Sequence, residues 1–183
     1  MTPAERDHAI AYLAETRESL LRATRGLSRG QLSFKPIPDR WSAAECLEHI
    51  VVVERRVLER VAEALRQPVD PAKRSAYEGR DDALVAQVTN RSERAKAPEM
   101  VIPTGRWPHE RLLPEFELAR KSSAEFAATN NDDLRRHLAG HPRFGELDCY
   151  QWLLLIGSHG ERHRQQIEEA VALAENPRTA GAV

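Results

Sequence analysis

Two histidines near the C-terminal end of the chain have the spacing of paired metal ligands. His159 and His163 lie four residues apart within SHGERHRQQIEE, residues 158–169. Residues four apart project from the same face of a helix, one turn from each other. Neutral imidazole is a good ligand for zinc, nickel and iron. The spacing therefore predicts that one helix presents two ligands to a divalent metal ion.

The residues around this pair indicate that its helical face points into the protein. Trp152 and Ile156 precede the two histidines on that face, and Ile167 and Ala170 follow them. The imidazoles thus stand in an apolar stripe, where leucines are expected. Burial of imidazoles without partners costs free energy. A bound metal ion would remove this cost, and hydrogen bonds to buried acids are the structural alternative.

A third histidine on another predicted helix also faces inward. His49 lies beside Cys46 and Val53, which belong to the inward stripe of that helix. A pair of ligands from one helix and a third from another would leave coordination positions open for water or substrate, as in catalytic metal sites. The sequence therefore predicts a metal site made by this histidine and the C-terminal pair.

Nearby polar residues have two interpretations each. Glu45, one turn before His49, is either a base or histidine-orienting group beside the metal, or only the acid of a helix-capping box. Gln166 either touches a bound ligand or packs at the rim of the site. Cys46 either approaches the metal or, as we favour, is a buried inert thiol. Trp41 is expected to pack at the start of its helix.

Four long helical patterns are expected to position these residues. Apolar residues at helical spacing predict helices over residues 3–27, 42–66, 108–129 and 148–174. Thr2 with Glu5 and Ser42 with Glu45 fit capping boxes, and Asp148 fits the cap of the last helix. Pro114 is expected to kink the third helix or to delay its start.

The connections between these helices are unequal in length. LSFKPIPDRW, residues 32–41, is expected to be extended, and HLAGHPRFGEL, residues 137–147, to be a loop. Residues 67–107 form a proline-rich, irregular crossover with a weakly patterned short helix over 81–93. No strand is expected. The prediction is an all-α, single domain over residues 1–183, a four-helix bundle with one long crossover and a flexible tail from 175 to 183.

The composition excludes several classes of protein. The 183 residues are 41% apolar and 30% charged, with a formal net charge of −1, so no basic nucleic-acid footprint is expected. Two cysteines outside any CxxC pair, and the polar start MTPAERDHAI, indicate a reduced, cytoplasmic protein without a signal peptide. Apolar runs such as WLLLI are far too short for a membrane span.

The segments around the histidines together resemble a known family. WSAAECLEHIVVVE around His49, the segment PTGRW, and HPRFGELDCYQWLLLIGSHGERHRQQI around the C-terminal pair are similar, in this order, to the DinB-like (DinB/YfiT-type) metalloprotein superfamily. The resemblance implies a four-helix bundle that is commonly a homodimer. It also implies a metal ion held at the positions of His49, His159 and His163.

The resemblance further implies a reaction class. Characterised relatives include S-transferases that use bacillithiol and related mycothiol-dependent enzymes, although many members have no known reaction. A divalent ion (zinc, nickel, iron or manganese) lowers the pKa of a bound thiol, which then attacks a small electrophile. We therefore expect an S-transferase that uses a low-molecular-weight thiol on a small-molecule substrate. A metal-dependent hydrolase and a non-catalytic metal-binding or ligand-binding protein are the alternatives.

Overall fold

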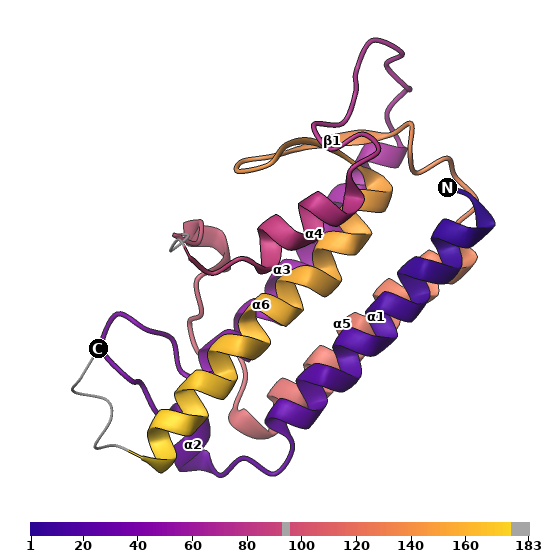
Figure 1. Ribbon diagram of the computed structural model, residues 1–183. Coiled ribbons are helices and arrows are strands. Elements are labelled where there is room, and N and C mark those ends of the chain that lie inside the picture. Colours follow the sequence, from indigo (N-terminus) through magenta and orange to yellow (C-terminus); the bar gives the residue numbers. More distant parts are fainter. Residues whose placement is uncertain (93–95, 177–183) are drawn as a thin grey trace.

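Four long helices form a closed bundle in the computed structural model, which describes residues 1–92 and 96–176. They are α1 (Pro3–Thr24), α3 (Ala43–Leu65), α5 (His109–Thr129) and α6 (Cys149–Glu175) (Figure 1). Helices α1 and α3 each pack against both α5 and α6. The predicted all-α four-helix bundle is therefore confirmed. No helix in the described part of the chain is long and apolar enough to cross a bilayer.

Side-chain caps determine where three of these helices begin. The caps are Thr2 for α1, Ser42 for α3 and Asp148 for α6, and each accepts a hydrogen bond from the backbone amide three residues later. In each case the side chain at that third position accepts from the amide of the cap in return, which satisfies two otherwise unpaired N–H groups. All three caps agree with the sequence prediction.

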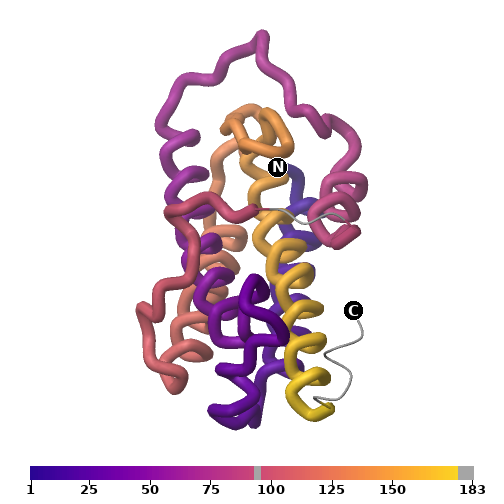
Figure 2. Tube along the Cα trace, turned by 90° about the vertical axis from the view of Figure 1, so that its left-hand side faces the viewer, coloured from indigo at the N-terminus to yellow at the C-terminus, as the bar shows by residue number. Residues whose placement is uncertain are grey.

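The connection between α3 and α5 is long because these two helices run in the same direction (Figures 1 and 2). A chain that leaves the end of α3 must return along the bundle before α5 begins. This crossover contains α4 (Asp81–Thr89), which packs on α6, and the short 3-10 helix η1 (Glu99–Val101). The short helix predicted for residues 81–93 thus exists but ends earlier, where Asn90 adopts an extended backbone.

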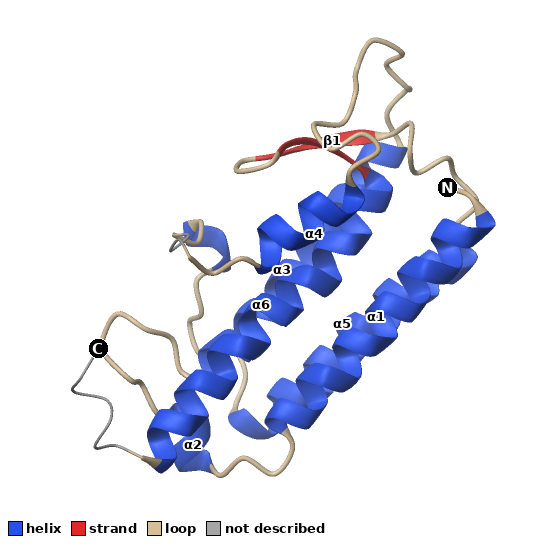
Figure 3. Cartoon of the chain, in the orientation of Figure 1, coloured by secondary structure: helices blue, strands red, loops and turns tan. Residues whose placement is uncertain are grey.

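The prediction that no strand is present is wrong. Residues expected to form a loop make an antiparallel hairpin of β1 (Leu138–His141) and β2 (Gly145–Asp148), drawn in red in Figure 3. Gly145 at the turn has φ of +72°, a conformation that glycine adopts at little cost. Each strand has only four residues, so neither shows a recognisable alternation of apolar and polar residues.

The connection before α3 also differs from its prediction. The segment expected to be extended from residue 32 begins inside a short helix, α2 (Arg29–Ser33), which a capping box of Ser28 and Gln31 opens. Helix α1 ends at Thr24 rather than near Leu27, because Arg25 is extended.

Two other predicted boundaries need correction. Helix α5 begins at His109 and continues through Pro114, so the proline does not delay its start. The predicted tail at 175–183 begins inside α6, which includes Glu175, and residues 177–183 lie outside the described residues.

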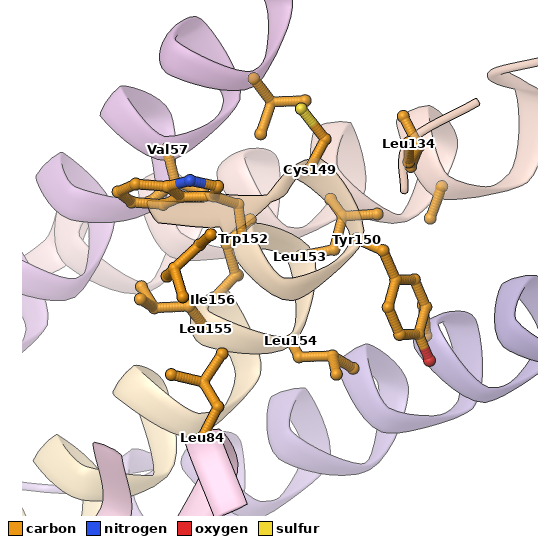
Figure 4. Packing of buried hydrophobic residues seen from close by; sticks show 14 of the residues in the cluster. Val57, Leu84, Leu134, Cys149, Tyr150, Trp152, Leu153, Leu154, Leu155 and Ile156 are labelled. Atoms are coloured by element: carbon orange, nitrogen blue, oxygen red, sulfur yellow. The ribbon is translucent and has the colours of Figure 1, made fainter. Parts of the chain in front are cut away.

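Two apolar clusters fill the bundle, one near the hairpin and one near α2. Figure 4 shows the first, in which Trp152, Leu153 and Ile156 of α6 pack with Val57 of α3 and Leu84 of α4. The second lies around the N-terminal half of α3, together with apolar residues of α1, α5 and α6. The bundle therefore has two apolar halves along its length.

A buried polar layer lies between the two apolar halves. The Arg120 guanidinium donates to the Glu54 carboxylate at 2.9 Å, and both side chains are only 2% exposed. Arg120 also donates to the Leu13 carbonyl and to Thr16 Oγ1, each at 2.8 Å, and Ser123 Oγ donates to Glu54 at 2.7 Å. These partners satisfy a buried charge pair that would otherwise be costly.

The contact between α1 and α6 gives a prediction about packing. A Cβ atom added at Gly157 would lie 2.6 Å from Cε1 of the Tyr12 ring. We expect Gly157→Ala to lower the free energy of unfolding by about 1–3 kcal/mol through overpacking, although alanine favours helix over glycine. Urea denaturation measures the change.

Gly30→Ala in α2 is the matched control. Gly30 is exposed, and its added Cβ would meet only Ser28 Oγ at 3.8 Å. This variant should be as stable as the original chain or slightly more stable. Equal stability of the two alanine variants would show that the Tyr12 ring moves away freely.

Candidate metal centre

The structure brings the three sequence-predicted histidines together across the interface of α3 and α6. Nε2 of His159 lies 3.1 Å from Nε2 of His49 and 3.1 Å from Nε2 of His163. One ligand nitrogen from each ring lies within 4.8 Å of the other two. The four-residue spacing on α6 aligns two of the rings, and the packing of α3 against α6 supplies the third.

Hydrogen bonds on the far side of two rings determine which nitrogen is protonated. Nδ1 of His49 lies 2.7 Å from the carbonyl oxygen of Val101, and Nδ1 of His163 lies 2.6 Å from Oε1 of Gln166. An oxygen acceptor requires the proton on Nδ1, so Nε2 of each neutral ring keeps its lone pair. The Cys46 thiol donates to the same Gln166 oxygen at 3.7 Å. Both lone pairs therefore point toward His159.

This arrangement fits a cation and is unfavourable without one. Nε2 of His159 can direct one proton to only one of its two neighbours, so the Nε2 lone pair of the other neighbour, also 3.1 Å away, is left without a donor. A metal ion accepts all three lone pairs. Zinc–nitrogen bonds of about 2.0–2.1 Å in a tetrahedral site place ligand nitrogens roughly 3.3 Å apart. The three histidines can therefore hold a divalent ion with little movement.

Burial keeps the three imidazoles neutral and ready to bind. Burial is the main cause that lowers the pKa of His49, and it lowers the pKa of His159 and His163 well below the ordinary value. The proximity of the other rings lowers the pKa of His159 and His163 further. His49 and His163 are buried, whereas His159 is partly exposed. Of the three rings, His159 is therefore the one with the most contact with solvent.

No fourth protein ligand joins the cluster in the part of the chain that the structure describes. The structure places Glu45 in the cap of α3, where its carboxylate accepts from the Ser42 amide at 2.8 Å and pairs with Lys35 at 2.9 Å. Cys46 is fully buried, and burial raises its pKa to about 12, so it remains a thiol. Three protein ligands leave coordination positions open.

Trp41 and Val101 belong to the site but were not predicted as parts of it. The Trp41 ring lies 4.6 Å from the His49 ring and 5.9 Å from the His163 ring, between centroids. Trp41 thus lies before α3, as expected, and in addition shields two of the three imidazoles. Because Trp41 lies in a connection, outside the helical pattern, the sequence gave no indication that its ring contacts the histidines. Val101 contributes only its carbonyl oxygen, which every residue type possesses.

Two other residues that the motifs include have structural roles here. Nδ1 of His141 accepts the amide N–H groups of Arg143 and Phe144 at 3.1 and 3.2 Å, which stabilises the hairpin turn. The Arg162 guanidinium donates to the Val88 carbonyl at 3.3 Å and to the Asn90 carbonyl, at the C-terminal end of α4. A cation there is favourable because the last carbonyls of a helix lack partners.

The lowered histidine pKa values predict how stability depends on pH. The unfolded chain binds protons at these imidazoles near pH 6.5, whereas the folded protein binds them only at lower pH. The contribution to stability is complete above pH 6.5 and is lost as the pH falls below it. Urea denaturation of metal-free protein at pH 7.5, 6.0 and 5.0 should show a decreasing free energy of unfolding. A His159→Asn, His163→Asn variant should show a smaller decrease, and an equal decrease would assign the effect to other groups.

Comparison with known proteins identifies the family of the chain. The chain is 30% identical to the uncharacterized protein YuaE of Bacillus subtilis (strain 168) over 166 aligned residues. The alignment covers 87% of this chain and 95% of YuaE. No solved structure matches significantly. A sequence profile of the DinB superfamily matches residues 12–167, which include all three histidines. The chain therefore belongs to the DinB superfamily.

Proposed function

We propose that this protein holds one divalent metal ion on His49, His159 and His163 and is a metal-dependent S-transferase. The observation that supports the metal most strongly is the convergence of three Nε2 atoms, two of them with lone pairs directed inward by their Nδ1 partners. The substrate we propose is a small electrophile, and the co-substrate is a low-molecular-weight thiol.

The residues around such a site have separate roles. His49, His159 and His163 would hold the ion, which would act as a Lewis acid and lower the pKa of a thiol beside it, so that the thiol would react as its thiolate. Val101 and Gln166 orient two imidazoles, and Trp41 covers them on one side. The partial exposure of His159 leaves the approach for the thiol and the electrophile.

The two alternatives fit the geometry less well. A hydrolase could use hydroxide formed from water on the ion itself, but no carboxylate of the described residues joins the three histidines to assist as a general base, and Glu45 is engaged in the cap of α3. A non-catalytic structural metal site has four protein ligands, whereas this cluster has three. We therefore favour transfer to a small molecule.

Further features of the proposal rest on the sequence and the family resemblance. Cys46 and Cys149 are free thiols, in agreement with a reducing, cytoplasmic setting. A homodimer remains a prediction, and analytical ultracentrifugation decides it.

Metal content tests the centre directly. We expect elemental mass spectrometry on untagged protein to find about one divalent ion per chain, because three imidazoles of suitable geometry converge. The His159→Ala, His163→Ala variant should contain none, since one histidine alone binds weakly. His8→Ala, which removes an exposed histidine near the start of α1 that does not belong to the cluster, should keep the metal content. Absence of metal from the original chain, even after incubation with zinc, nickel and iron, would contradict the proposal.

The reaction class needs a separate assay on metal-loaded protein. We expect consumption of a low-molecular-weight thiol in the presence of an aromatic halide electrophile, and we expect it to stop when a chelator removes the ion. A chromogenic ester without thiol should not be cleaved faster than in buffer. Ester cleavage without thiol would favour the hydrolase, and inactivity in both assays with metal bound would favour a non-catalytic protein.

A further inference from the structure

A segment of the crossover lies against α3 beside the candidate metal centre. Residues 99–106, which we name the strap, follow α4, and Figure 2 shows this part of the crossover running beside the bundle toward the start of α5. The strap contacts α3 through η1. It contributes the Val101 carbonyl that accepts from His49.

The strap is attached to α3 by a buried carboxylate next to His49. Glu48 is 3% exposed, and its carboxylate accepts three consecutive backbone amides, those of Thr104 at 2.7 Å, Gly105 at 2.9 Å and Arg106 at 3.1 Å. Gly105 has φ of +74°, which lets the three N–H groups converge in a nest that suits an anion. The Arg106 guanidinium, 3.6 Å away, adds a charge partner.

Two consecutive residues of α3 therefore hold the strap at two places. Glu48 holds residues 104–106, and His49 holds Val101, only three residues earlier. So short a connection allows the carbonyl little movement while the nest remains closed. Opening of the nest would release the carbonyl and leave the His49 ring without its fixed Nδ1 partner.

We propose that Glu48 is a positioning residue of the metal centre. Through the strap it keeps the Val101 carbonyl on Nδ1 of His49, and thereby directs Nε2 of that ring toward His159. This role rests on the proposed metal function, although its effect on the His49 ring exists without metal. Partners that orient metal-bound histidines typically change metal affinity by 10–100-fold when they are removed.

The test compares two buried glutamates of the same helix. Glu48→Gln keeps the size of the side chain but leaves one oxygen to accept three amides. Glu54→Gln is the control, because Glu54 is equally buried but does not touch the strap, and the glutamine oxygen can still accept from Arg120 and Ser123, which keeps the helices aligned. Both variants should lose stability, so stability alone does not distinguish them. Cobalt(II) affinity, the cobalt absorption spectrum and the His49 tautomer by nitrogen-15 NMR do distinguish them.

We expect Glu48→Gln to bind cobalt(II) at least tenfold more weakly than the original chain and with an altered spectrum. In its metal-free form, the His49 proton should be shared between Nδ1 and Nε2 instead of residing on Nδ1. Glu54→Gln should keep affinity, spectrum and tautomer. Unchanged affinity and tautomer in Glu48→Gln, or equal losses in both variants, would overturn the proposal.

Gly105→Ala provides an independent variant if Glu48→Gln fails to fold. Its added Cβ meets no atom within 4 Å, so it opposes the nest only through the positive φ. We expect the same changes, to a smaller degree, and their absence would overturn the role of the strap. If the original chain binds no cobalt(II), the proposed metal function fails, and the His49 tautomer in the metal-free variants still decides the role of Glu48.

Discussion

The 3.1 Å approach of His49 and His159 across the interface of α3 and α6 is the contact on which the site depends. Imidazoles with inward lone pairs repel each other, so the surrounding structure must hold them in place. The hydrogen bonds from Nδ1 to Val101 and Gln166 do so, and helix packing on both sides prevents the rings from separating.

The topology of the bundle explains why an irregular segment lies beside this contact. Parallel α3 and α5 require a connection along the length of the bundle (Figure 2), and Val101 of that connection contacts His49. Its backbone supplies groups that pair with one another inside a long helix, namely the Val101 carbonyl for His49 and three consecutive amides for Glu48. The crossover is therefore a part of the site as well as a link between helices.

The predictable parts of the fold and the site are those with helical periodicity. His159 and His163 share the apolar stripe of Ile156 and Ile167, so their inward direction followed from spacing alone. The hairpin was missed because four-residue strands show no period. Trp41 and Val101 were missed because a connection has no face to predict, and because a backbone carbonyl has no signature in side-chain types. Glu48 resembled other helix acids, and only the path of the crossover shows its partners.

The polar layer of Arg120 and Glu54 has a consequence for the alignment of the helices. If one helix slid along its neighbour by one turn, about 5.4 Å, the guanidinium would enter an apolar half of the core. An unpaired buried charge costs several kcal/mol, so such sliding is strongly opposed. The same slide would carry His49 out of reach of His159. The layer thus fixes the alignment of the helices along the bundle axis. Apolar residues in its place would remove this constraint, even if they stabilised the core.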